Sequence, residues 1–207
     1  TAPFSANSHK RTVGAYAEQT LKFRAARTVM TLGGRLDRLT NETVETRLKT
    51  NFTPSAATFH VFNPSIGLKH QLRPGLRAHV TAGRAFIPAE AFQLTGSTVS
   101  TIGGRTQINQ GNADLRPERS TSFDVGAEWS AATTRVDVTV FRTKVRDRFI
   151  SNVTISNPPG PAPIVVSVEN GLDAHLSGLE LELAQRIGSR VGVFANRITQ
   201  QQDLCMV

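Results

Sequence analysis

Apolar and polar residues alternate one by one in eight stretches of this 207-residue sequence. In residues 121–129, Thr, Phe, Val, Ala and Trp occupy every second position, and Ser, Asp, Gly and Glu lie between them. A period of two places alternate side chains on opposite faces of a β-strand, whereas an amphipathic helix needs a period of about 3.6. The sequence therefore predicts an all-β chain without helices.

The alternating stretches form four pairs, and a short turn joins the two members of each pair. The pairs cover residues 13–37, 65–86, 121–140 and 179–195. Longer polar segments separate the pairs, at about 40–63, 87–120 and 151–168. Short turns at one rim and long loops at the other are typical of a membrane-spanning barrel, whereas a soluble sandwich has no reason to sort its loops by length.

The two faces of these strands differ in a way that also indicates a barrel. One face is aliphatic, with Phe23, Phe86, Phe123 and Trp129 near strand ends, as in the aromatic girdles of membrane barrels. The other face mixes charges with glycines, which a wide, water-filled lumen tolerates and a small closed barrel does not. We therefore predict an antiparallel, up-and-down transmembrane β-barrel segment of about eight strands, which is part of a larger barrel.

Charge and motifs exclude several other classes of protein. The formal net charge is +8, but the basic residues are scattered through apolar runs and form no block of the kind that nucleic acid requires. Cys205 is the single cysteine, and no His-x3-His or His-Glu-x-x-His spacing occurs, so no metal or cofactor is expected. Two carboxylate pairs, Glu180 with Glu182 and Asp124 with Glu128, are better explained as lumen charges than as a glycosidase site. The chain is not expected to be an enzyme.

The sequence Asn112-Ala-Asp-Leu-Arg-Pro-Glu-Arg-Ser120 runs directly into an alternating strand. It resembles the Asn-x-x-Leu-x-Pro-Glu-x-Ser segment of TonB-dependent outer-membrane receptors. Residues 136–150, 168–183, 32–37 and 83–88 resemble further strands of that family, in the same order. The resemblance implies a structural role for eight motif residues, which are Asn112, Asp114, Leu115, Pro117, Glu118, Asn170, Gly178 and Glu180.

Three of these motif residues also have a physical interpretation. Pro117 lacks an N–H and disfavours helical geometry at Arg116, so it suits the entry to a strand. Leu115 is expected to anchor the rim of the barrel. Glu118, together with Arg119, is expected to pair with charges of the lumen or the loops.

The resemblance also implies a function and a location. A receptor of this family carries a plug domain and about 22 strands, so residues 1–207 are expected to be a partial barrel domain without the plug or the barrel ends. The whole receptor would import a scarce nutrient such as a ferric siderophore across the Gram-negative outer membrane. Its partners would be outer-membrane lipid, the nutrient and, through the plug, the inner-membrane TonB complex. The alternatives are a small porin-like or structural outer-membrane barrel and, third, a soluble β-sandwich.

Four arginines are weak candidates for contact with a nutrient. They are Arg77, on the lumen face, and Arg105, Arg116 and Arg119, in the longest loop. A basic funnel could attract an anionic ferric chelate. The simpler interpretation is that these side chains meet lipid headgroups or acidic residues from the rest of the barrel.

Overall fold

The computed structural model describes residues 6–47, 54 and 56–206, which form ten β-strands and one short helix. The elements are β1 (Ser8–Phe23), β2 (Thr28–Thr43), β3 (Ala56–Arg73), β4 (Leu76–Ile87), α1 (Ala91–Thr95), β5 (Ser97–Ile102), β6 (Arg105–Gln110), β7 (Glu118–Ser130), β8 (Thr134–Ser156), β9 (Ile164–Ile187) and β10 (Val191–Met206).

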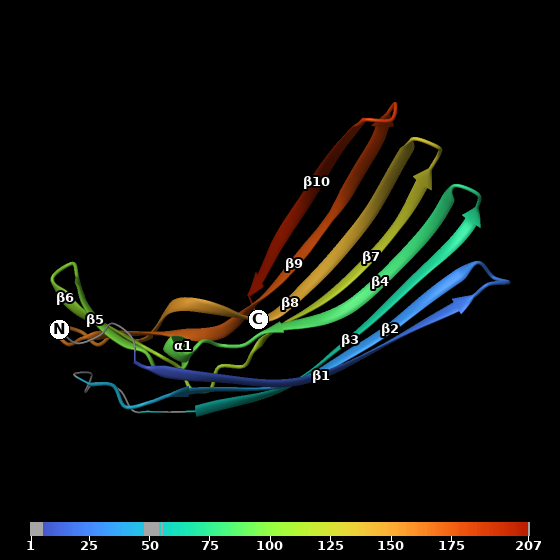
Figure 1. Cartoon of the computed structure of the whole chain (residues 1–207). Helices are drawn as coiled ribbons and strands as arrows, with labels where there is room; N and C mark the ends of the chain where they lie inside the picture. The colour runs from blue at the N-terminus through green and yellow to red at the C-terminus, as the bar shows by residue number, and fades with distance from the viewer. Residues whose placement is uncertain (1–5, 48–53, 55, 207) are drawn as a thin grey trace.

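The strands form one open, strongly curved sheet (Figure 1). Eight of them, β1, β2, β3, β4, β7, β8, β9 and β10, follow one another as an antiparallel meander. The four tight turns gather at one end of this meander, at the upper right of Figure 1, and the long connections gather at the other end. Within the described residues β1 pairs only with β2, and β10 pairs only with β9, so the meander has a free edge at each end. The predicted up-and-down order of hairpins is confirmed.

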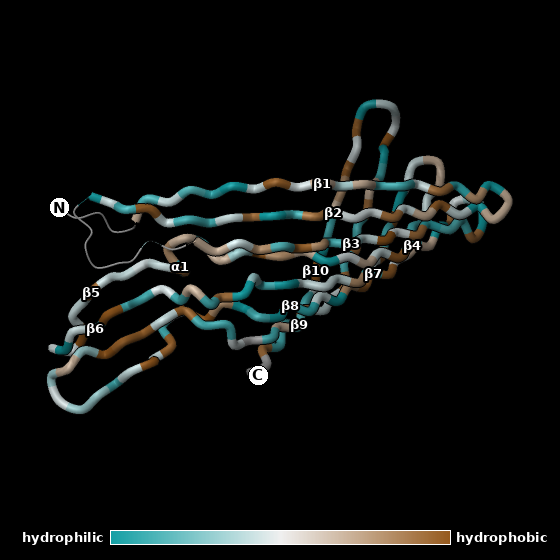
Figure 2. The backbone as a smooth tube through the Cα atoms, turned by 90° about the horizontal axis from the view of Figure 1, so that it is seen from below, coloured by the Kyte–Doolittle hydropathy of each residue, from teal (hydrophilic) through white to brown (hydrophobic). Residues whose placement is uncertain are grey.

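Neighbouring strands pair so that their apolar positions coincide. One row of directly opposed residues crosses seven strands and consists of Leu21, Met30, Leu68, Val80, Val125, Val140 and Leu179. The next row lies on the other side of the sheet and consists of Thr20, Thr31, Gly67, Thr81, Asp124, Phe141 and Gly178. We call the side that carries Val125 the apolar face and the side that carries Asp124 the polar face. Figure 2 shows the resulting alternation of hydropathy along the strands near the tight turns.

The apolar face is the more exposed of the two. Along β7 the residues alternate strictly between exposed and half-buried, and the exposed set contains Phe123 (50% exposed), Val125 (42%) and Trp129 (46%). The Glu128 side chain, on the polar face, is 14% exposed. A water-soluble sheet would bury its apolar side, so this face requires an apolar surrounding.

Three details of the prediction were wrong. The segment 87–120 is not a plain loop, because it contains α1 and the β5–β6 hairpin, so the count of eight strands is not confirmed and the expectation of no helix fails. Strands β8 and β9 continue far into the segment predicted as loop 151–168. A strand that has the same surroundings on both faces does not select a period of two, so sequence alternation cannot reveal it. No helix among the described residues is long and apolar enough to cross a membrane.

The segment between β4 and β7 folds over the polar face at the long-loop end. Ala89, Leu94, Leu115 and Val168 form a small buried cluster, against which Phe59 and Phe149 pack. The Asn41 side-chain amide donates to the backbone carbonyl of Ala89, and the Thr95 hydroxyl donates to Thr43 Oγ1 over 3.0 Å. This cluster joins the long connection to β2, β3, β8 and β9.

Candidate functional site

The charged part of the polar face lies near the tight turns. Three adjacent strands supply its centre, because Arg77 on β4 lies directly opposite Glu128 on β7, and Glu128 lies opposite Asp137 on β8. The neighbouring row brings in His79 and Glu180, which β4 and β9 carry. A hollow of about 220 Å³ forms here, lined by Lys69, Arg77, Ala78, His79, Glu128, Arg135, Asp137, Thr139, Glu180 and Glu182.

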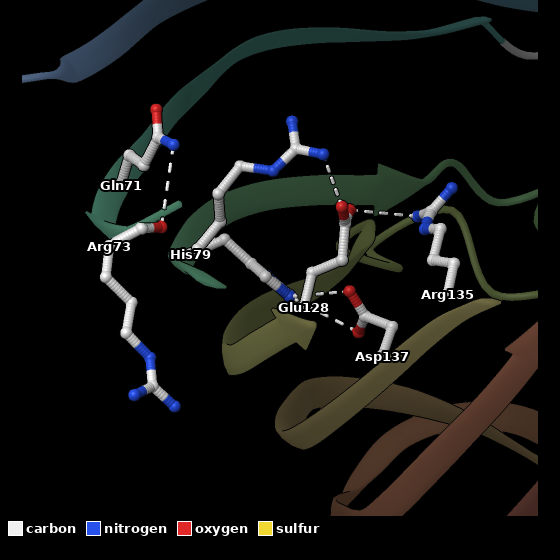
Figure 3. Close-up of polar contacts among 7 residues, drawn as sticks. Gln71, Arg73, His79, Glu128, Arg135 and Asp137 are labelled. Carbon is white, nitrogen blue, oxygen red and sulfur yellow. Dashed lines mark hydrogen bonds and ion pairs between the residues drawn. The ribbon is translucent and has the colours of Figure 1, made fainter. Parts of the chain in front are cut away.

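Most of these charges are paired (Figure 3). Glu128 accepts from Arg77 on one carboxylate oxygen, and its other oxygen lies 3.2 Å from Arg135 Nη2. His79 Nε2 lies 3.3 Å from Asp137, whose Oδ1 also accepts from the Thr139 hydroxyl over 2.9 Å. Acids and bases are mixed in this network, which we call the charged wall, so neither sign of charge predominates. No three His, Cys, Asp or Glu side chains in the described part gather closely enough to hold a metal ion.

The four candidate arginines occupy separate places. Arg77 lies in the charged wall. Arg105, on β6, donates to Asn157 Oδ1, Pro158 O and Ala162 O, which holds the connection between β8 and β9. Arg116 Nη2 lies 2.7 Å from Asp147 Oδ1. Arg119 lies on the same side of the sheet as Val125 and opposes Phe86 and Arg146. They form no common funnel within this chain, and contact with a nutrient at any of them stays a prediction.

The motif residues of 112–118 hold the entry to β7 in place. The Asn112 side-chain amide donates to Val168 O (3.2 Å) and to Glu169 Oε2 (2.9 Å), and its oxygen accepts from the Asp114 N–H. Leu115 is 3% exposed within the buried cluster, and Pro117 is also buried. Leu115 therefore anchors the long connection to the sheet, and its role at the rim of a barrel stays a prediction.

Glu118 has a different partner from the one expected. Its Oε1 accepts from the backbone N–H of Phe149 on β8, at 2.8 Å, and it forms no ion pair within the described part of the chain. The pairing of β8 with β9 is irregular between Val145 and Phe149, and Asp147 has a φ of 56°. A bulge leaves backbone groups without ladder partners, and Glu118 satisfies one of them.

Asn170 supplies one further partner for this bulge and ties it to the backbone of Arg116. Its Oδ1 accepts from the Arg116 N–H (2.8 Å), and its Nδ2 donates to Arg116 O (2.9 Å) and to Asp147 O (2.6 Å). Two motifs that lie far apart in the sequence therefore meet at one junction, which consists of Asn112, Glu118 and Asn170 with the backbone of β8.

Gly178 and Glu180 lie further down β9, on the polar face. The ring of Phe141 covers Gly178, and a Cβ at that position would lie 2.6 Å from Phe141 Cζ. Glycine at 178 therefore leaves room for an aromatic ring on the neighbouring strand. Glu180 lines the charged hollow. The sequence showed both as motif residues, but only the register of β8 against β9 shows what they contact.

Loss of the Asn170 side chain should weaken the junction. We expect Asn170→Ala in the full-length protein to lower the free energy of unfolding by about 2 kcal/mol, because three part-exposed backbone groups lose their partner. The measurement is a urea titration of the folded protein. Asn157→Ala is the matched control, since the Asn157 side chain accepts one exposed hydrogen bond from Arg105, and it should cost less than about 1 kcal/mol. Equal losses in the two variants would contradict the proposed role of Asn170.

Solved structures share this arrangement of strands. The FrpB iron transporter of Neisseria meningitidis matches 98% of this chain with 27% of its own, at a TM-score of 0.66 and 15% identity. The copper transporter OprC matches 94% of this chain with 29% of its own (TM-score 0.69, 16% identity). The ferric-catecholate import receptor Fiu of E. coli K12 matches 95% with 28% of its own (TM-score 0.67, 17% identity).

These structures show the fold alone, and this chain spans less than a third of the length of each. None of the curated protein sequences matches the chain. The sequence profile described as TonB dependent receptor-like, beta-barrel matches residues 2–204, which is nearly the whole length. Proteins of this family are outer-membrane β-barrels that act as transport receptors and not as enzymes. The chain therefore belongs to the TonB-dependent receptor-like β-barrel family.

Proposed function

We propose that this chain is part of the barrel wall of an outer-membrane receptor that imports a scarce nutrient, such as a ferric siderophore, with energy supplied through the TonB system. The observation that carries this proposal is the inverted burial of the sheet. Large apolar side chains such as Phe123, Val140 and Leu179 are exposed on one face. On the other face, charged side chains contact one another, as in the pair of Arg77 with Glu128 and the pair of His79 with Asp137. Such a wall separates lipid from a wide aqueous lumen.

The free edges of β1 and β10 support a larger barrel. Unpaired backbone N–H and C=O groups are costly in lipid, so further strands must pair with both edges. Residues 1–207 then form a partial barrel domain, and the plug and the remaining strands belong to the rest of the receptor. A small porin-like barrel would need β1 to pair with β10, and the described residues do not pair in this way.

The structures that share this fold support the proposed class of nutrient. The solved structures that share the fold are described as transporters of iron or copper or as an import receptor for ferric catecholates. We extend this class to the present chain. The partners of the whole receptor would be outer-membrane lipid, the ferric chelate or a similar nutrient, and the TonB complex of the inner membrane, reached through the plug.

Growth under iron limitation tests the proposal. The full-length receptor that contains this chain is produced in a Gram-negative strain that lacks its own siderophore receptors, with and without TonB. We expect one chelate from a panel of ferric siderophores to restore growth only where TonB is present. Growth that does not depend on TonB would indicate a passive pore and would refute the receptor proposal.

A further inference from the structure

A cluster of basic side chains lies beyond the apolar rows, toward the long-loop end of the sheet. We call Arg84, Arg119, Arg142, Lys144 and Arg146 the basic cluster. Together with His60 and His175 they line a hollow of about 710 Å³ whose lining contains no carboxylate. Five cations around one hollow create a strongly positive local potential.

The register places the basic cluster on the lipid side of the wall and not in the lumen. Arg142 lies opposite Phe123, which belongs to the apolar face. One step further along the strands, Lys144 and Arg84 both lie opposite Thr121. One further step on, Arg146 lies opposite Arg119. All of these positions are separated from Val125, Val140 or Val80 by an even number of residues, so they project from the same side of the sheet.

The arginines of the basic cluster lack the partners that the arginines of the polar face have. Arg35, Arg77 and Arg135 each form an ion pair with a carboxylate. Arg84, Arg119, Arg142 and Arg146 are exposed, and no hydrogen bond or ion pair joins their side chains to other described residues. Lys144 Nζ lies 2.9 Å from Asp173, and the same carboxylate also attracts Arg146 electrostatically. The guanidinium groups of Arg84, Arg119 and Arg142 have no carboxylate partner in the described part of the chain, so their charge is available to anions from outside the chain.

The height of the basic cluster matches the edge of a membrane. Arg119 and Trp129 lie at the two ends of β7. Their separation is about 33 Å along the strand at roughly 3.3 Å per residue, which becomes about 25 Å along the barrel axis for a tilt near 40°. The apolar band of an outer-membrane barrel is about 25 Å tall. If Trp129 lies at one interface, the basic cluster lies at the other, level with the lipid headgroups.

We propose that the basic cluster binds the phosphate groups of lipid headgroups in the leaflet on the long-loop side. This inference rests on the proposed membrane location of the chain. Guanidinium groups bind phosphate oxygens in pairs of parallel hydrogen bonds, and partial removal from water strengthens such contacts. The hollow beside Phe62 and Phe123 also offers apolar contact to the first part of the acyl chains.

Lipid binding by the purified full-length receptor tests this site. The receptor in detergent is titrated with bis-phosphorylated lipid A and with lipid A from which both phosphates have been removed, and bound lipid is counted by native mass spectrometry. We expect the wild-type receptor to bind the phosphorylated lipid at least about tenfold more tightly, given four charge-assisted contacts. Equal binding of the two lipids would overturn the proposal, because the site would then not recognise phosphate.

A variant pair keeps the test specific to the basic cluster. The variant Arg84→Gln, Arg119→Gln, Arg142→Gln and Arg146→Gln should lose the preference for the phosphorylated lipid. The matched control changes four exposed arginines at the tight-turn end, Arg24, Arg73, Arg186 and Arg190, to glutamine and removes the same charge. It should bind like the wild type, and loss of binding in both variants would refute a localised site. Import is measured with the same variants, so failure of lipid binding with intact import rejects this site while leaving the receptor function standing.

Discussion

Val125→Arg in the full-length receptor is expected to lower the free energy of unfolding by about 2–4 kcal/mol, the cost of an arginine near the middle of the lipid-facing surface of a barrel. Val125 lies in the apolar row between Val80 and Val140, on a central strand. Its side chain is 42% exposed, so the arginine would meet lipid and not a packed core. The measurement is a denaturant titration of the receptor refolded into lipid vesicles.

Thr20→Arg is the matched control for this effect. Thr20 belongs to the polar row next to that of Val125 and is also exposed. An arginine there would extend into water, and we expect a loss below about 0.5 kcal/mol, as for surface substitutions in general. A tolerated arginine at 125 together with a damaging one at 20 would show that the two faces of the sheet have been assigned the wrong way round.

Leu115→Ala should release the long connection between β4 and β7 from the sheet. Leu115 is 3% exposed and packs with Ala89, Leu94 and Val168. Removal of three carbons from a buried leucine typically costs about 2–5 kcal/mol. The cluster holds the connection but lies away from the apolar rows. We therefore expect the substitution to lower the free energy of local opening of residues 88–117, and to leave the free energy of unfolding of the barrel unchanged.

Hydrogen exchange of the full-length receptor measures that opening directly. Amide protection in 88–117 should fall by about thirtyfold or more in Leu115→Ala, which corresponds to at least 2 kcal/mol. Ile102→Ala removes the same number of carbons from the same connection, but Ile102 is 58% exposed and should leave the protection almost unchanged. Unchanged exchange in Leu115→Ala would mean that the cluster does not hold the connection.

The sequence identified the motif residues but did not predict all of their contacts. Asn112, Leu115 and Asn170 could be singled out from their family pattern, but the burial of Leu115 is known only from the structure. The partner of Glu118 was missed, because it is the backbone N–H of Phe149 in a bulge of β8. A bulge has no sequence pattern as clear as a period of two, and the residue at its strained position, Asp147, is not a glycine.

The charged wall and the basic cluster were missed for a related reason. Alternation placed Arg77 and Glu128 on the polar face. It did not predict that the two side chains would form a pair, because the residue that lies opposite another depends on the register of the strands. Arg84 and Arg142 lie on the apolar face at positions beyond the end of the apolar alternation, so the sequence pattern did not predict a cluster there. The basic cluster forms because β4, β7 and β8 are neighbours in the sheet, although β5 and β6 lie between β4 and β7 in the sequence.

The sequence by itself determined the class of the fold, the pairs of strands joined by tight turns, and which side of each strand is apolar. These properties are local, because the side of a strand on which a residue lies depends only on whether its position is odd or even. The tertiary structure decided what that local pattern does not encode, namely the β5–β6 hairpin and α1, the bulges held by Glu118 and Asn170, and the two groups of charges on opposite faces. Contacts between distant strands follow from register and strand order, and the packing of the whole sheet sets both.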